Sequence, residues 1–319
     1  MRTRSEPLAI APTGSVPTAL ELSGWPARRR KETAIRRAFG AAAAVSIVIS
    51  AVIVLALIGR AIDFLRHIDP SWLVADGWFP RRDQFSIPTL AAGSLIVAAI
   101  AMVIAVPLGL GSALYLSEYA RPRVRRMLKP VIELLAGVPS IVVGFFALTV
   151  ISPGFVQRLF SSATFFSLAA AGIGVGILAT PLVATVSEDA LRAVPQSLRE
   201  GAYGLGARTR TTSVRVVVPA ATSGIMAATI LGFSRAIGET MVVLMVAGGT
   251  GGSAFTLDPL GPGQTATGAM AALAIGSDQV KGSGSAFPSL FFVGLLLFVV
   301  TLALNTLSER FVRRSRRHG

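Results

Sequence analysis

The sequence predicts an all-α fold, that of a polytopic membrane protein with six transmembrane helices. Its mean hydropathy is +0.66 and only 14% of its 319 residues are charged, which is more apolar than a water-soluble chain. Six apolar runs are long enough to cross a bilayer, which takes about 20 helical residues. None of these runs alternates like a barrel strand, and helices satisfy their own backbone hydrogen bonds in lipid, so we expect helices.

The expected spans are each bounded by Pro, Gly or charged residues. They lie near residues 38–59, 89–117, 131–152, 165–187, 220–248 and 287–307. Residues 1–37 are polar and basic, and we expect a disordered cytoplasmic tail there. The first run, about 22 residues long, exceeds the core of a signal peptide, so it should remain as the first helix. One membrane domain is expected over residues 38–310, followed by a basic cytoplasmic tail at 311–319.

Positive charge is distributed unevenly between the two sides of the membrane. If the N-terminus is cytoplasmic, the inner segments hold 23 of the 30 Lys and Arg residues, and the outer loops hold six. This positive-inside distribution predicts that both termini are cytoplasmic. It also accounts for the net charge of +14 without nucleic acid as a partner.

Several kinds of catalytic and metal chemistry have no residues to support them. Cysteine is absent, and His67 and His318 are far apart in the sequence, which argues against disulfides and against His or thiolate metal centres. A Walker motif needs Lys followed by Ser or Thr, but Lys31, Lys129 and Lys281 precede Glu, Pro and Gly. The sequence therefore predicts a transport subunit rather than an enzyme, without a cofactor of its own.

Two long outer connections differ in composition. Residues 60–87 include Trp72, Trp78 and Phe79, which we expect to form an aromatic belt at the membrane interface, with contact to an external partner as the alternative. Residues 250–286 are rich in Gly, Ser and Pro and should form a flexible connection. The second to fifth spans also contain many Gly and Pro residues, which predicts a closely packed core that is able to rearrange.

The inner connection at residues 188–219 contains a helical pattern from Gln196 to Leu205, which the glycines at 204 and 206 should end. This short amphipathic helix lies outside the membrane. Its apolar face, formed by Leu198, Ala202, Tyr203 and Leu205, needs a surface to cover, either on its own bundle or on another protein.

The same loop resembles the EAA loop of ATP-binding-cassette (ABC) importer permeases. That pattern is Glu, two small residues, three of any kind, Gly, nine more, then aliphatic-x-aliphatic-Pro. The positions are filled here by Glu200, Gly201, Ala202, Gly206, Val216, Val218 and Pro219. Gly201 stands where the family usually has Ala, which weakens the helix by up to about 1 kcal/mol. In the family this loop docks into the cytoplasmic ATPase, so the resemblance implies a coupling role for Glu200, Gly201, Ala202, Gly206 and Pro219.

Three longer runs resemble the permeases of high-affinity phosphate importers and together cover most of residues 100–250. They are AVPLGLGSALYLSEYARPRVRRMLKPVIELLAGVPSIVVGFFAL, SEDALRAVPQSLREGAYGLGA and GFSRAIGETMVVLMVAG. The residues MVVLMVAG after GET favour the C-type permease, because the A-type usually has AP there. The resemblance implies the type I (MetI-like) permease fold of ABC importers and a location in the plasma (inner) membrane.

The resemblance also implies partners. They are a second permease of the A type (PstA-like), two copies of an ATP-binding subunit (PstB-like) and an extracytoplasmic phosphate-binding protein (PstS-like). In such a complex, ATP and Mg are bound by the ATPase and not by this chain.

Arg235 and Glu239 stand inside the fifth expected span, where one charge costs roughly 2.5–3.5 kcal/mol on insertion scales. In a continuous helix they share a face, and Arg235 would lie about 16 Å into the hydrocarbon, near its middle. One interpretation is a structural ion pair. The other is a guanidinium that binds phosphate, with Glu239 orienting it when no substrate is present. Ser234 and Thr240 flank the pair and either donate to substrate oxygens or bond back to their own helix.

The sequence thus predicts a permease subunit of an ATP-driven phosphate importer that works by alternating access. Sulfate and molybdate stay open as substrates, since one Arg does not distinguish oxyanions, and the A-type permease is the alternative within the family. A membrane enzyme or an ion channel is the alternative from another class.

Three other acids lie in or near the expected spans. Glu118 is expected to reach water, and Glu133 and Glu188 should be structural. For Glu133, facing the pathway or a partner is the alternative.

Overall fold

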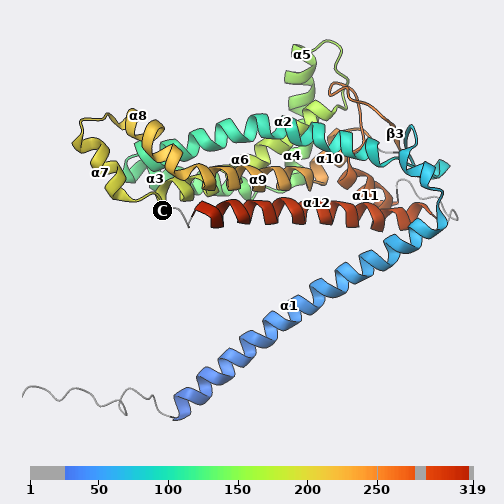
Figure 1. Cartoon of the computed structure of the whole chain (residues 1–319). Coiled ribbons are helices and arrows are strands. Elements are labelled where there is room, and N and C mark those ends of the chain that lie inside the picture. Colours follow the sequence, from blue (N-terminus) through green and yellow to red (C-terminus); the bar gives the residue numbers. More distant parts are fainter. Residues whose placement is uncertain (1–25, 250, 277–284, 316–319) are drawn as a thin grey trace, which may run out of the picture. The chain divides into compact units, whose positions relative to one another are not determined.

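A computed structural model describes residues 26–249, 251–276 and 285–315 of the chain, and Figure 1 shows its elements. Three of the elements, η3, η4 and η5, are π-helical, whereas η1 and η2 are 3-10 turns. In chain order they are α1 (Pro26–His67), η1 (Pro70–Val74), β1 (Gly77–Phe79), η2 (Pro80–Arg82), β2 (Gln84–Phe85), α2 (Ile87–Leu114), η3 (Tyr115–Tyr119), α3 (Pro122–Ala136), α4 (Ser140–Phe146), η4 (Ala147–Val156), α5 (Gln157–Leu159), α6 (Leu168–Arg192), α7 (Gln196–Gly204), α8 (Thr209–Thr212), η5 (Ser213–Val217), α9 (Val218–Ile237), α10 (Met241–Val246), β3 (Ser253–Ala254), α11 (Ala266–Ile275) and α12 (Ala286–Ser315).

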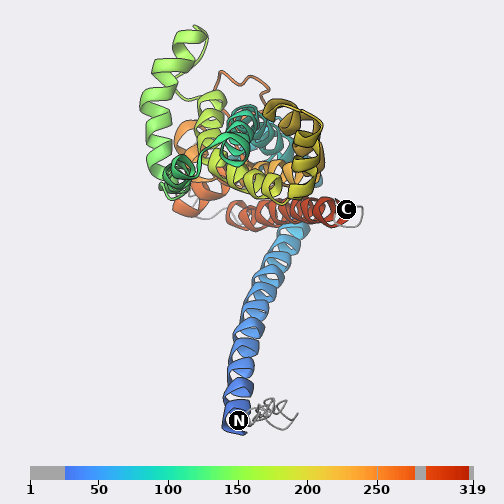
Figure 2. The same ribbon diagram turned by 90° about the vertical axis from the view of Figure 1, so that its left-hand side faces the viewer.

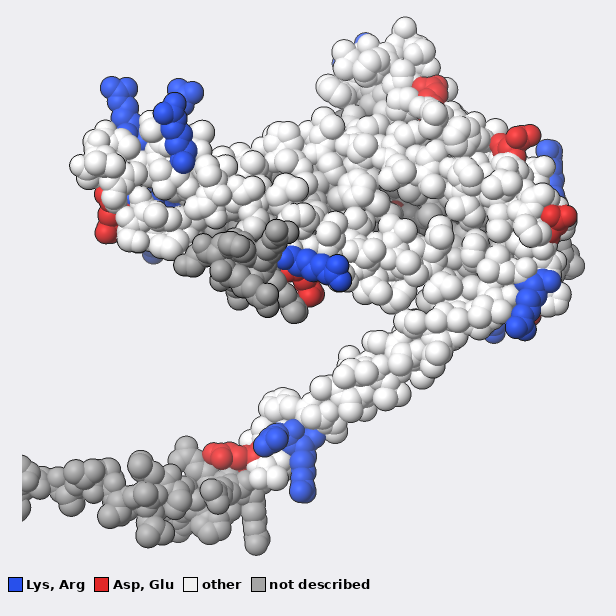
Figure 3. Space-filling view, viewed as in Figure 1, with Lys and Arg blue, Asp and Glu red and all other residues white. Residues whose placement is uncertain are grey.

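The prediction of six membrane-spanning helices is confirmed. The helical segments long and apolar enough to cross a bilayer are Glu32–His67, Ile87–Tyr119, Ser140–Leu159, Leu168–Arg192, Thr209–Ile237 and Ala286–Phe311. The chain divides into Met1–Leu55, described from Pro26 as one uninterrupted helical stretch, and Ala56–Gly319, which contains the bundle. In Figure 3 the side of the bundle is largely free of charge and the charged side chains gather towards its ends. Residues 1–25 and 316–319 of the expected tails lie outside the described residues.

The centre of the bundle is the contact between α2 and α6, which lie side by side in Figures 1 and 2. Two isoleucines of α2 pack over two glycines of α6. A Cβ added at Gly172 would lie 2.7 Å from the Cβ of Ile100, and one added at Gly176 would lie 3.1 Å from the Cβ of Ile104. Small residues let membrane helices approach this closely, so the packing expected from the glycine content is confirmed here.

The third span differs from the expected range of 131–152. Helix α3 ends at Ala136, and Gly137, Val138 and Pro139 separate it from the span that begins at Ser140. The residue before a proline is disfavoured in the helical region, so the helix ends in front of Pro139. As a result α3 is a separate amphipathic helix with none of its residues buried.

The fifth span is also broken. The range 220–248 was expected to be one helix, but α9 ends at Ile237 and α10 begins at Met241. Gly238, a poor helix former, is the last residue with helical dihedral angles at the end of α9. Arg235 and Glu239 therefore do not share a helical face.

The connection at residues 60–87 is folded into the bundle. Strand β1 pairs antiparallel with β2 and with β3, and Trp78 and Phe85 are fully buried. The ring centroids of Phe64 and Phe85 are 5.2 Å apart in an edge-to-face contact, and those of Trp78 and Phe85 are 5.7 Å apart. The prediction of an interface belt is wrong for Trp78, because this ring belongs to a second apolar core.

Asp69 lies beside this core and caps η1. The backbone N–H of Ser71 donates to the Asp69 carboxylate at 2.9 Å, which lowers the pKa of Asp69.

The connection at residues 250–286 is not simply a flexible loop, although residues 277–284 lie outside the described part. It contains α11, which begins at the N-cap Thr265, whose hydroxyl accepts from the Gly268 N–H at 3.1 Å. Ala269, Ala272 and Leu273 of α11 are buried against the bundle. The capping threonine and the alanine-rich run that follows are local signals that could have predicted this helix.

Replacing Gly172 by Ala should destabilise the bundle, because the added Cβ would press on Ile100 at 2.7 Å. Overpacking of this kind typically costs about 1–3 kcal/mol. Gly111→Ala is the matched control in α2, since nothing lies within 4 Å of its added Cβ. Thermal unfolding of the purified protein should give a lower Tm for Gly172→Ala than for Gly111→Ala. Equal Tm values would contradict the close contact between α2 and α6.

Candidate functional site

The break between α9 and α10 is held by Glu239, whose side chain is buried at 8% exposure. Its Oε1 accepts hydrogen bonds from the backbone N–H groups of Thr240 and Met241, at 3.1 and 3.2 Å. These N–H groups stand at the start of α10, where no earlier turn of helix supplies acceptors. The hydroxyl of Thr267 in α11 donates to the backbone carbonyl of Glu239 at 2.6 Å, which fixes the break from the other side.

Arg235 lies in the last turn of α9 and is exposed in the single chain. It does not pair with Glu239, and among the described residues its guanidinium has neither an ion pair nor a hydrogen bond. The structure therefore lacks the ion pair that the sequence suggested. An arginine without an acceptor is left with its full set of N–H donors.

All four predicted substrate residues line one cavity of about 360 Å³. Ser234 is buried, and the Thr240 hydroxyl bonds back to the Gly238 carbonyl at 3.3 Å, which is the alternative expected for it. The complete lining is Ser140, Ser234, Arg235, Gly238, Glu239, Thr240 and Met241. Sequence reasoning missed Ser140, which begins the third span directly after Pro139. The sequence Gly-Val-Pro-Ser, which marks a helix start, was the signal that could have found it.

The coupling loop contains the expected helix, since α7 runs from Gln196 to Gly204. The helix ends in a Schellman motif at Gly206, whose φ is +79°. The Gly206 N–H donates to the Tyr203 carbonyl at 2.9 Å, and the Ala207 N–H donates to the Ala202 carbonyl at 3.0 Å. A glycine is needed here because other residues are strained at positive φ.

The outer face of α7 is not covered by the described part of this chain. Glu200 and Gly201 are exposed, Ala202 is half-buried, and Leu205 is 91% exposed. Pro219, at the other end of the motif, lies exposed in the first turn of α9. An apolar helix face presented in this way is suited to docking in a groove of another protein.

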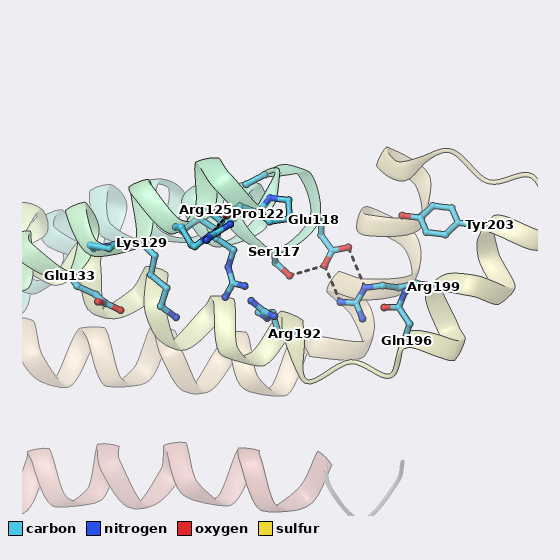
Figure 4. A pocket seen from close by; sticks show the side chains of 14 residues that line it. Ser117, Glu118, Pro122, Arg125, Lys129, Glu133, Arg192, Gln196, Arg199 and Tyr203 are labelled. Atoms are coloured by element: carbon cyan, nitrogen blue, oxygen red, sulfur yellow. Dashed lines mark hydrogen bonds and ion pairs between the residues drawn. The ribbon is translucent and has the colours of Figure 1, made fainter.

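Arg199 fastens the inner face of α7 to the bundle (Figure 4). Its Nη2 donates to Glu118 at 3.0 Å and to the Leu191 carbonyl at 2.8 Å, and its Nη1 donates to the Val194 carbonyl at 2.6 Å. The side chains of Arg199 and Glu118 are only 11% and 3% exposed. The prediction that Glu118 reaches water is therefore wrong, because it joins the end of α2 to α7.

A second ion-pair cluster lies beside this one, around Glu188, which is 1% exposed. Its Oε1 accepts from Arg125 of α3 at 2.6 and 2.9 Å. The Nζ of Lys129 is 3.4 Å from Oε2, and Arg192 is 3.9 Å from Oε1. The expected structural role of Glu188 is in keeping with this geometry, but its partners on α3 are about sixty residues away and could not be identified from the sequence.

The fold defines a multi-pass membrane permease with a separate amphipathic helix, α7, between its fourth and fifth spans. Residues 105–317 match the family model described as "Binding-protein-dependent transport system inner membrane component", and the chain belongs to this family. The family indicates a transport subunit of the inner membrane that works with a second permease, an ATPase and a binding protein.

Similar curated proteins include the "Phosphate transport system permease protein PstC" of Haemophilus influenzae, which is 32% identical over 286 residues, or 84% of this chain and 88% of that protein. The "Probable ABC transporter permease protein YqgH" of Bacillus subtilis is 40% identical over 181 residues, which span 56% of this chain and only 58% of that protein. Among solved structures, an inward-facing MetNI methionine ABC transporter is similar with a TM-score of 0.49 and 20% identity, covering 72% of this chain and 93% of that one.

Replacing Arg199 by Gln should loosen α7, because it removes the charge-assisted hydrogen bonds to Glu118 and to two carbonyls. A hydrogen bond to a charged group contributes about 1.5–3 kcal/mol, so amide hydrogen exchange in residues 196–207 should accelerate about tenfold or more. Arg208→Gln in the same loop is the control, since the Arg208 side chain is exposed. If the two variants exchange at the same rate, Arg199 does not hold α7.

Proposed function

We propose that this chain is the C-type permease of an ATP-driven phosphate importer and that phosphate passes through the cavity at Arg235. The observation that carries this proposal is a guanidinium without a described partner, which lines a cavity beside a break in a membrane span. Two relatives, 32% and 33% identical to this chain and matched over 88% and 80% of their own length, bear the name of a phosphate transport permease. An ionisable side chain within a membrane segment is by default a functional candidate.

Arg235 can present two parallel N–H groups to one phosphate, a geometry that a lysine does not offer. The hydroxyls of Ser234, Ser140 and Thr240 line the same cavity and supply further donors. Glu239 occupies the N–H groups at the start of α10, which would otherwise bind an anion tightly. Weak binding suits a transport pathway, because the substrate must leave the site as well as enter it.

Glu239 also favours phosphate over sulfate. At neutral pH phosphate still has a proton to donate to a carboxylate, whereas sulfate has none and meets only like charge. Sulfate and molybdate remain the competing substrates. Competition in an uptake assay distinguishes them, since excess sulfate should leave phosphate uptake unchanged and should compete only in Glu239→Gln.

Coupling runs through α7 in this proposal. An A-type permease completes the pathway, and two ATP-binding subunits, which hold ATP and Mg, press on Glu200, Gly201, Ala202 and Gly206. Arg199 passes this displacement to η3, which continues α2, and to the end of α6, and the bundle rocks between outward and inward access. Pro219 ends the loop where α9 begins.

The proposed orientation puts both termini and α7 in the cytoplasm, following the positive-inside distribution. An extracytoplasmic phosphate-binding protein then delivers substrate at the opposite end, where the sheet of β1, β2 and β3 lies. The proposed domains are a tail at 1–37, a permease domain at 38–310 with the coupling loop at 188–219, and a tail at 311–319.

Replacing Arg235 by Gln should reduce phosphate uptake at least tenfold in vesicles that contain the complete complex. One lost charge-assisted hydrogen bond is worth about 1.5–3 kcal/mol, and about 1.4 kcal/mol is tenfold. Arg235→Lys should give an intermediate rate, because it keeps the charge and loses the two-pronged geometry. Arg123→Gln, on exposed α3, is the control. Unchanged uptake by Arg235→Gln would refute the assigned role.

Replacing Gly206 by Ala should uncouple ATP hydrolysis from transport, because a left-handed residue with a Cβ costs about 1–2 kcal/mol and distorts the end of α7. Gly204→Ala is the matched control, since Gly204 lies in the same helix without positive φ and with nothing within 4 Å of an added Cβ. Copurification of the ATPase and phosphate-stimulated hydrolysis are the measurements. Retention of both by Gly206→Ala would contradict the docking role.

A further inference from the structure

A cavity of about 840 Å³ lies at the end of the bundle that carries α7, and it shares no residue with the cavity at Arg235. Its walls come from η3, α3, the last turn of α6 and α7 (Figure 4). The function proposed above uses Arg199 and Glu118 of its lining, but it assigns no ligand to the cavity.

Cations outnumber acids on these walls. The lining includes five cationic side chains, Arg125, Arg126, Lys129, Arg192 and Arg199, but only two acids, Glu118 and Glu133. Arg199 and Glu118 neutralise each other. Behind the wall, the single carboxylate of Glu188 is shared by three of the cations. A surplus of positive charge therefore remains on the cavity walls.

The surplus is concentrated on three side chains. Arg125 takes the short contacts to Glu188. Lys129 and Arg192 are left at 3.4 and 3.9 Å from the same carboxylate, which leaves most of their N–H donors unused. The guanidinium of Arg126 makes only a 3.5 Å contact with the Pro122 carbonyl. In Figure 4, Arg125 and Lys129 point from α3 towards the helix that bears Arg192.

The opposite face of α3 is apolar and uncovered by the described part of the chain. Met127 and Leu134 are 73% and 72% exposed, and Val131 is 54% exposed. Helix α3 thus turns its cations towards the cavity and its apolar side chains outwards, as a helix beside acyl chains does. Basic pockets between membrane helices on the cytoplasmic side bind the phosphate of acidic lipid headgroups.

We propose that this cavity binds a phosphate group, with Arg126, Lys129 and Arg192 as its ligands. The group belongs either to the headgroup of an acidic phospholipid or to free inorganic phosphate, since both present the same tetrahedral oxyanion. A bound phosphate neutralises the surplus and bridges α3 to α6. It lies next to the Arg199–Glu118 pair, so its occupancy adjusts how firmly α7 is held.

The test uses the complete complex with the variant pair Arg126→Gln and Arg192→Gln combined, and Arg123→Gln as the matched control on α3. In the lipid arm, the complex is exchanged into phosphatidylcholine with added phosphatidylglycerol, and retained lipid is measured by native mass spectrometry. In the phosphate arm, binding of inorganic phosphate is measured in phosphatidylcholine alone, in an Arg235→Gln background. That background removes the proposed transport site, so failure of one proposal does not mimic failure of the other.

We expect the double variant to lose at least tenfold in binding in one of the two arms, while Arg123→Gln binds like the parent. Loss in the lipid arm identifies a headgroup, and loss in the phosphate arm identifies the free ion. Equal binding by the parent and the double variant in both arms would overturn the proposal. If the double variant does not assemble, Arg126→Gln alone decides, because its guanidinium makes only one long contact within the described residues.

Discussion

The site depends on the hydrogen bonds from the first N–H groups of α10 to the Glu239 carboxylate. Where a helix breaks within a bilayer, the freed backbone groups need a partner, either from the protein or from water in a cavity. Glu239 provides that partner through one carboxylate oxygen, Oε1. Arg235 is consequently left without an acid, although it stands only four residues away. Among the described residues Arg235 therefore has no acidic partner, and the helix break lies directly after its last turn, at Gly238.

The sequence was sufficient to predict an element where hydropathy or glycine placement within one segment carries the whole signal. The six apolar runs, the helix at Gln196 and its stop at Gly206 were all predicted correctly, because hydropathy and glycine act within one segment. The sequence misled at Pro139 and Gly238, where one apolar run divides into two helices although its hydropathy continues across the division. Pairs such as Arg199 with Glu118 join residues about eighty apart, and only the folded chain brings them together.

Polar interactions concentrate at one end of the bundle. Helix α7 is joined to η3 by the Arg199–Glu118 pair, and the Glu188 cluster beside it joins α6 to α3. Buried ion pairs stabilise little compared with apolar packing, but they fix which groups are adjacent. These pairs therefore specify which helices lie next to α7.

The isoleucines of α2 and the glycines of α6 also limit which motions are possible. Ile100 and Ile104 are seated over Gly172 and Gly176, so both pairs repeat after about one helical turn, roughly 6 Å. If α2 slid along α6 by less than one turn, its isoleucines would collide with residues that have a Cβ. If it slid by a full turn, only one of the two glycines would still lie under an isoleucine. The close packing of isoleucine on glycine therefore opposes sliding of α2 along α6, and we expect these two helices to move together.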